Sequence, residues 1–284
     1  MFCADHFALV VYSMCACASL VREQLPLLMQ RACTQCCMLY PCSFFIAWNG
    51  VLTLVYEGFP AQLARLKSHL NEPHLHVKPE NYGSKWPKTT MGALIDDAPE
   101  FSLDELRQLH HLCMQHSQVL SSFPALGVPV SQLSVVTYAA RGLEAQGRQH
   151  VDHVPIRPAP PFDEGADDGY DLSECTEEES QRVKSVLSEW DDLAAYLPRV
   201  NQPGSRISSF REASPSGSTL VTFIAPPPPD GNYSLEPDGD YCLQRVTQLQ
   251  TMLQGFRAAV DALFPGRYAW LEQESLHVTL RALD

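Results

Sequence analysis

The sequence lacks several features that identify common classes of protein. It contains no apolar run of 18 residues, so it predicts no transmembrane helix and no membrane partner. Basic residues are few, with 20 Lys and Arg against 33 Asp and Glu in 284 residues, a formal net charge of −13. Because broad nucleic-acid binding needs a basic face that neutralises phosphates, we expect no extended nucleic-acid surface. A small basic pocket for one phosphate stays compatible with this composition.

Cysteine is scarce in most of the chain, since seven of the ten cysteines lie before residue 43. A secreted disulfide framework would spread its cysteines across the domain, so we interpret the protein as reduced and intracellular, cytoplasmic by default. Cys33, Cys36, Cys37 and Cys42 have metal-like spacing, but a second pair of ligands is lacking. The sequence also has no glycine-rich phosphate loop and no Gly-x-Ser-x-Gly elbow. We therefore predict no metal and no cofactor.

Composition divides the chain into four parts. Residues 1–47 are cysteine-rich and have only four charged residues. An organellar targeting segment and a wrongly assigned protein start fit this composition about equally, so we predict no fold for these residues. Residues 48–142 and 218–284 carry ordered patterns and are predicted to be two lobes. Between them, residues 143–217 read as an insertion rich in acidic residues, Pro and Ser, with nine acidic and no basic residues from 158 to 181.

Each predicted lobe has the order strand, helix, strand. In the first lobe, Pro60 suits a helix start and Ser102 with Glu105 forms a capping box. Apolar residues at steps of three and four predict a long amphipathic helix in the second lobe. The predicted strands are 51–56, 86–94, 134–140, 220–225 and 275–283. One predicted helix follows Pro60, and the others span 102–120, 177–196 and 240–264.

Two of these strands align without a gap. Lys88-Thr89-Thr90 lies over His277-Val278-Thr279, and in both a basic residue is followed two positions later by threonine. Alternate residues of a strand share a face, so each pair points to one side. If the strands meet around one cleft, the four side chains suit a phosphate. Threonine hydroxyls donate to its oxygens, the lysine ammonium neutralises charge, and histidine moves a proton near pH 7.

At these residues the chain resembles the 2H phosphoesterase superfamily, whose mark is two His-x-Thr/Ser motifs on strands of a bilobal α+β fold. The resemblance covers about residues 50–140 and 218–284, and it implies a duplicated α+β fold. It also implies that His277 transfers a proton and that Thr90 and Thr279 hold phosphate oxygens. Lys88 departs from the pattern, because it stands where the family has a histidine. The sequence stops five residues after Thr279, so the second lobe is expected to be incomplete.

The resemblance implies a phosphodiesterase, an RNA ligase-like hydrolase that acts on 2′,3′-cyclic phosphates or on phosphodiesters at RNA ends. Its predicted catalytic residues are His277, Thr279, Lys88 and Thr90, and Trp86 is a candidate for stacking on a base. One alternative is a phosphate- or nucleotide-binding module with little turnover, because lysine is a poor base at its ordinary pKa of about 10.4. Another is an interaction protein that acts through its acidic insertion. The oligomeric state is not predicted.

Three smaller candidates remain in the sequence. His116 falls on the apolar stripe of the predicted helix 102–120, so we expect it to be a core histidine. Tryptophans are more often core residues than stacking platforms, which is the competing interpretation for Trp86. His150 and His153 flank Asp152 in a spacing that could hold a metal, although a solvated segment is the simpler interpretation.

Overall fold

The computed structural model describes residues 19–78, 80, 86–123, 126–156, 174–213, 216–224 and 239–283, with side chains in the last helix from residue 246 on. Helices and antiparallel sheets are mixed, so the expected α+β class is confirmed. The strands are β1 (Cys37–Leu39), β2 (Pro41–Ile46), β3 (Leu52–Tyr56), β4 (Lys88–Leu94), β5 (Val128–Val130), β6 (Gln132–Tyr138), β7 (Arg148–Pro155), β8 (Gly217–Phe223), β9 (Tyr268–Trp270) and β10 (His277–Ala282). The labelled α-helices are α2 (Ala61–His69), α3 (Leu103–Ser121), α4 (Glu177–Leu187), α5 (Leu193–Val200), α6 (Ser208–Arg211) and α7 (Gly239–Leu263).

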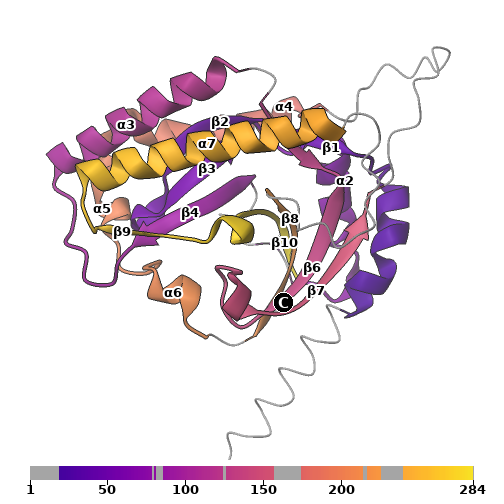
Figure 1. Ribbon diagram of the computed structural model, residues 1–284. Helices are drawn as coiled ribbons and strands as arrows, with labels where there is room; N and C mark the ends of the chain where they lie inside the picture. Colours follow the sequence, from indigo (N-terminus) through magenta and orange to yellow (C-terminus); the bar gives the residue numbers. More distant parts are fainter. Residues whose placement is uncertain are drawn as a thin grey trace, which may run out of the picture.

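The strands form two four-stranded sheets and one short ribbon (Figure 1). The first sheet has the order β2-β3-β4-β9 and the second has the order β10-β8-β6-β7, while β1 pairs with β5. Every pair of neighbouring strands is antiparallel. One large cluster of buried hydrophobic residues runs through both sheets and the helices that cover them.

The two sheets exchange strands between the predicted lobes. β9 follows the long helix α7 in the chain, yet it pairs with β4 in the first sheet. Conversely, β6 and β7 come from the first half of the chain and pair with β8 in the second sheet. The expected simple duplication of strand–helix–strand halves is therefore not confirmed. The strands that the second lobe was expected to lack are supplied by β6 and β7.

The boundary expected at residue 48 is not a boundary of the fold. Residues 19–31 are helical, and Val21, Leu25 and Leu28 from this segment are buried in the main core. β2 follows directly and is an edge strand of the first sheet. Charge and cysteine content set this segment apart in the sequence, but the partly buried cysteines Cys36 and Cys42 pack as small hydrophobic side chains.

The edge of β2 is covered by helices, which protects it from pairing with another chain. The backbone N–H of Phe44 donates to Ser117 Oγ of α3 at 2.9 Å. At the end of the strand, the carbonyl of Ile46 accepts hydrogen bonds from Trp190 Nε1 and from Tyr196 Oη, at 3.3 and 2.9 Å. These contacts bring the residues after α4 against the first sheet.

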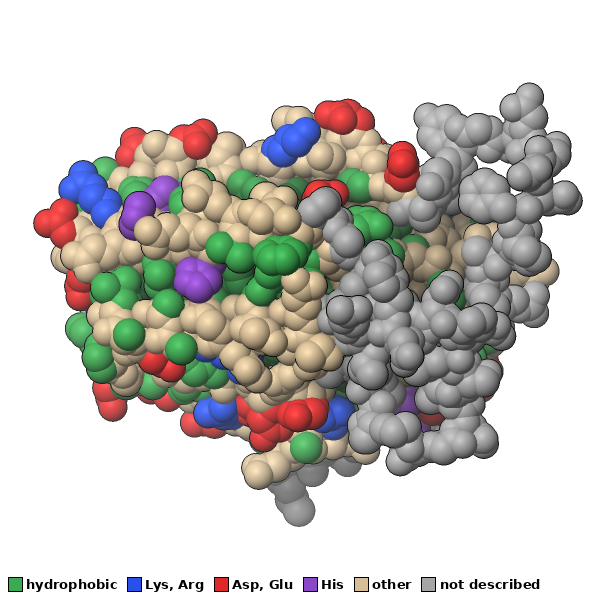
Figure 2. All heavy atoms as spheres, turned by 45° about the horizontal axis from the view of Figure 1, so that its top comes forward, with side chains coloured by type: hydrophobic (Ala, Val, Ile, Leu, Met, Phe, Trp, Pro, Cys, Tyr) green, Lys and Arg blue, Asp and Glu red, His purple; other side chains and the backbone are tan. Residues whose placement is uncertain are grey.

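Figure 2 looks onto the side of the molecule that α3 and α7 cover. Beneath these helices, Phe44 of β2 stacks on Phe256 of α7 with ring centroids 4.2 Å apart. Figure 2 shows hydrophobic side chains among polar ones on this side. On α3, Met114 and Val119 are exposed at 42% and 46%. Both helices are therefore amphipathic layers over the sheet. In the described part of the chain, no helix is long and apolar enough to cross a membrane.

Two expectations for residues 143–217 need correction. β7, at residues 148–155, is a full strand of the second sheet, although this stretch was expected to begin an insertion. The expected helix 177–196 is divided into α4 and α5. Asp192 causes the second start, because its carboxylate accepts hydrogen bonds from the backbone N–H groups of Ala194 and Ala195.

Candidate functional site

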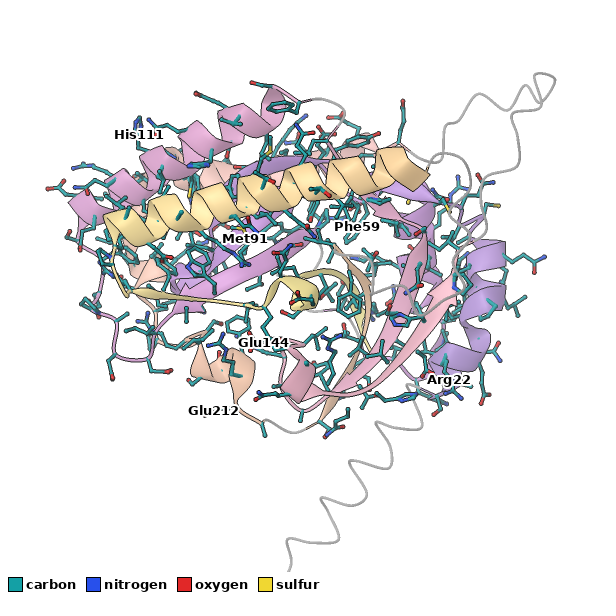
Figure 3. The ribbon with its side chains drawn as sticks, viewed as in Figure 1. Arg22, Phe59, Met91, His111, Glu144 and Glu212 are labelled. Atoms are coloured by element: carbon teal, nitrogen blue, oxygen red, sulfur yellow. The ribbon has the colours of Figure 1, made fainter. Side chains whose placement is uncertain are left out.

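β4 and β10 lie against each other, although they belong to different sheets and are not hydrogen-bonded partners (Figure 1). Burial alternates over the first four residues of each strand, as a period of two requires. Lys88 and Thr90 on β4 are partly exposed, and so are His277 and Thr279 on β10. Their neighbours Thr89, Met91, Val278 and Leu280 are fully buried at 0%. Met91 marks β4 in Figure 3, below α7.

The structure therefore brings together the two strands that carry the predicted residues. In each strand, the basic residue and the threonine two positions later share the partly exposed face. The opposite face of each strand is fixed in the core, and on β4 it is tied further by a 3.0 Å hydrogen bond between Thr89 Oγ1 and Tyr56 Oη. A one-residue slip in either strand would bury the motif, so the core sets its register.

Lys88 has an unusual environment for a lysine. Its ammonium lies 4.0 Å from the centre of the Trp86 ring, a cation–π contact. Burial, together with the nearby charge of Lys67, lowers the pKa of Lys88 to about 8, although Glu80 acts in the opposite direction. Lys67 itself pairs with Glu80 at 3.2 Å. Lys88 is thus mostly protonated at pH 7 but close enough to its pKa to give up a proton.

His277 has a defined tautomer. Its Nδ1 lies 2.6 Å from the carbonyl oxygen of Ser275. A carbonyl can only accept a hydrogen bond, so Nδ1 carries the proton and Nε2 keeps its lone pair. Burial lowers the pKa of His277 below its ordinary value, and the charge of Arg148 acts in the same direction. His277 is therefore neutral at pH 7, in the form that accepts a proton at Nε2.

Trp86 is a core residue. It is 8% exposed and meets Phe45 edge-on, with ring centroids 6.2 Å apart. The Lys88 ammonium already lies over its ring. Stacking of a base on Trp86 stays a prediction, and the contacts on the ring show a second role: Trp86 holds the lysine.

Two groups near the motif were missed in the sequence. Arg148 lies at the start of β7, in a stretch expected to be an insertion, and its charge acts on His277. Phe223 lies directly opposite His277 on the neighbouring strand β8, and the two rings meet edge-on at 6.2 Å. The segment lacks a period-two signal, because Val151 and Val154 lie three residues apart among polar residues.

The remaining sequence candidates do not form a second site. Among the described residues, no group of three or more His, Cys, Asp or Glu side chains is placed to hold a metal. Cys37 is buried, and burial raises the pKa of its thiol to about 12. His116 is partly exposed and meets the stacked rings of Phe44 and Phe256 edge-on, at 5.9 and 5.4 Å, so it lies at the border of the core. His150 pairs with Asp152 at 3.0 Å.

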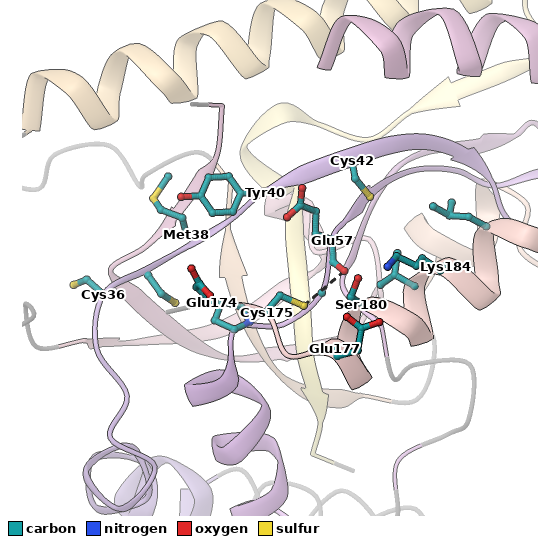
Figure 4. Close-up of a pocket in the computed structure, with 15 residues that line it drawn as sticks. Cys36, Met38, Tyr40, Cys42, Glu57, Glu174, Cys175, Glu177, Ser180 and Lys184 are labelled. Carbon is teal, nitrogen blue, oxygen red and sulfur yellow. Dashed lines mark hydrogen bonds between the residues drawn. The ribbon is translucent and has the colours of Figure 1, made fainter. Parts of the chain in front are cut away.

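A cavity of about 860 Å³ lies elsewhere, between β1, β2 and α4 (Figure 4). Cys36, Cys42 and Cys175 line it together with Glu57, and the Cys175 thiol donates to the Glu57 carbonyl at 3.8 Å. Burial raises the pKa of the Cys42 thiol to about 12, which makes it a poor nucleophile. None of the four motif residues lines this cavity.

Comparison with known proteins gives no relative. No family model, no curated protein and no solved structure matches the chain. The function therefore has to be argued from the site itself.

Proposed function

We propose that the protein is a phosphodiesterase that hydrolyses 2′,3′-cyclic phosphates of nucleotides or of RNA ends. The supporting observation is the meeting of β4 and β10, each with a basic residue and a threonine on its partly exposed face. Two groups that move protons and two hydroxyl donors are what the hydrolysis of an anionic phosphodiester needs.

The directions of the pKa shifts support one assignment of the proton transfers. His277 is neutral and its Nε2 carries no proton, so it is the base that takes a proton from the attacking water. Lys88 is protonated at pH 7 with a pKa of about 8, so it is the acid that protonates the leaving oxygen. A base that is neutral and an acid that is protonated at the same pH are what an acid–base pair needs.

The step is balanced in atoms and charge. The water oxygen bonds to phosphorus as its proton passes to His277 Nε2, and the bond from phosphorus to one ribose oxygen breaks. That oxygen receives a proton from Lys88 Nζ, and the product is a nucleoside 2′- or 3′-monophosphate. Thr90 and Thr279 donate hydrogen bonds to the non-bridging oxygens, whose charge grows in the transition state. Solvent then returns a proton to Lys88 and removes one from His277.

Hydrolysis of adenosine 2′,3′-cyclic phosphate by purified variants tests this proposal. We expect His277→Asn and Lys88→Met each to lower kcat by about 10²- to 10⁴-fold, since each removes one proton-transfer partner. His116→Gln is the matched control, because His116 is a histidine whose pKa burial also lowers but which lies on α3. Equal activity in all three variants would contradict the proposal.

The alternative of a binding module with little turnover makes a different prediction for one variant. If Lys88→His creates or greatly raises hydrolysis, the native protein binds phosphodiesters without turning them over efficiently. If Lys88→His retains activity and moves its alkaline limit below that of the native enzyme, Lys88 is the native acid, because histidine loses its proton at lower pH than Lys88 does.

A further inference from the structure

Arg148 is a cation close to His277, and among the described residues no carboxylate forms an ion pair with it. Its guanidinium lies 5.6 Å from the centre of the Phe223 ring, and Phe223 is the residue directly opposite His277. The carboxylate on the same strand, Asp152, pairs instead with Arg22 and His150. Within the described ranges, Arg148 Nε is buried and has no hydrogen-bond partner. This arrangement differs from that of Arg211, which forms a 2.8 Å ion pair with Glu144.

Such a cation beside an imidazole is unfavourable unless an anion joins it. Burial penalises an unpaired charge, and a positive charge near His277 opposes the imidazolium that forms when this histidine takes a proton. An anionic ligand on this side would pair with the guanidinium and would also stabilise the imidazolium. Arginine suits the role, because its planar group binds two phosphate oxygens at once.

We propose that Arg148 is a substrate-binding residue that pairs with the negative charge of the phosphodiester on the His277 side of the site. This inference rests on the proposed function and adds that the two ends of the site bind different parts of the substrate. The ligand's phosphate is held by arginine at the end where water is activated, while Lys88 serves the leaving oxygen at the other end. The substrate class is therefore an anionic phosphodiester, and a neutral triester of the same shape is excluded.

Calorimetric binding of two probes tests the inference without turnover. We expect Arg148→Met to weaken binding of adenosine 2′-monophosphate by about 10- to 100-fold and to leave binding of adenosine unchanged, because only the first probe carries the charge. Arg148→Lys should recover part of the loss. Arg257→Met is the control, since Arg257 also lies over an aromatic ring, Trp270, at 5.5 Å and also has a buried Nε without a partner among the described residues.

Titration of the His277 imidazole by NMR provides a second readout that needs no ligand. Arg148 lowers the pKa of His277, so Arg148→Met should raise this pKa, and Arg257→Met should not. An unchanged His277 pKa, or unchanged affinity for adenosine 2′-monophosphate, overturns the role of Arg148 and leaves the proposed function standing. If the native protein neither binds this probe nor hydrolyses the cyclic phosphate, both proposals fail.

Discussion

At the scale of single residues, the candidate site pairs a histidine, His277, with a lysine, Lys88, whose surroundings make it more acidic than an ordinary lysine. An ordinary lysine has a pKa of about 10.4 and holds its proton too tightly to be an efficient acid at neutral pH. Burial and Lys67 bring the pKa of Lys88 to about 8. Lys67 therefore acts on the pKa of Lys88 through its positive charge. Its ammonium is held in place, because the residue is 8% exposed, pairs with Glu80 and lies over the Phe59 ring at 4.2 Å.

This environment predicts the pH dependence of hydrolysis. In the proposed mechanism, activity needs neutral His277 and protonated Lys88, so it should rise with pH through the lowered pKa of His277 and fall above about pH 8. At pH 9 only about a tenth of Lys88 is still protonated. Lys67→Met removes a like charge and frees Glu80, and both changes raise the pKa of Lys88. The alkaline limb of kcat/KM should therefore move to higher pH.

The control for this profile is Lys184→Met, because Lys184 lies on α4 at the wall of the separate cavity in Figure 4. Its profile should overlay that of the native protein. An alkaline limb that stays in place in Lys67→Met would show that Lys67 does not act on the acid, whatever its effect on the maximal rate.

At the scale of elements, the sequence predicted the start of a helix best where all the residues of the signal lie close together in the chain. Ser102 and Glu105 form the capping box that starts α3, with the Glu105 N–H donating to Ser102 Oγ and the Ser102 N–H donating to the Glu105 carboxylate. Ser102→Ala should lower the free energy of unfolding by about 1 kcal/mol, because one N–H at the helix start loses its acceptor.

Urea denaturation of Ser102→Ala and Ser122→Ala measures this contribution on one helix. Ser122 lies at the other end of α3, where its hydroxyl donates to the carbonyl of Gln118 on an exposed surface. Its loss should cost less than about 0.5 kcal/mol. Equal costs at the two ends would mean that the capping box does not stabilise this helix.

Other elements were hidden because their signals are not local. β2 is covered by α3 and by residues after α4, so its Pro, Cys and Ser residues are acceptable at an edge that helices protect. β7 is polar along most of its length because it is an edge strand of the second sheet, next to β6, and none of its side chains is buried. The period of two within one strand was enough to predict which residues share a face, and this holds for Lys88 with Thr90 and for His277 with Thr279. Arg148 was missed because its neighbour His277 lies 129 residues away in sequence (277 − 148).

At the scale of the whole molecule, the exchanged strands join the two sheets into one structure. β9 comes from the second half of the chain but belongs to the first sheet, where it pairs with β4. This pairing depends on Gly92 of β4. A Cβ at Gly92 would lie 2.6 Å from the Trp270 ring and 2.9 Å from the backbone oxygen of Ala269. Since a backbone atom cannot move aside as a side chain can, the strand pairing itself must shift.

We therefore expect Gly92→Ala to destabilise the whole protein by about 1–3 kcal/mol, in a single transition. Tryptophan fluorescence follows the first sheet through Trp86 and Trp270, and the NMR signal of His277 follows the second. Gly255→Ala is the control: it lies in α7 with no atom within 4 Å of an added Cβ, so it should stabilise the helix by about 0.5–1 kcal/mol. Because the exchange ties each sheet to strands from both halves of the chain, the midpoints of the two probes should coincide in both variants, and separate midpoints would contradict a shared core.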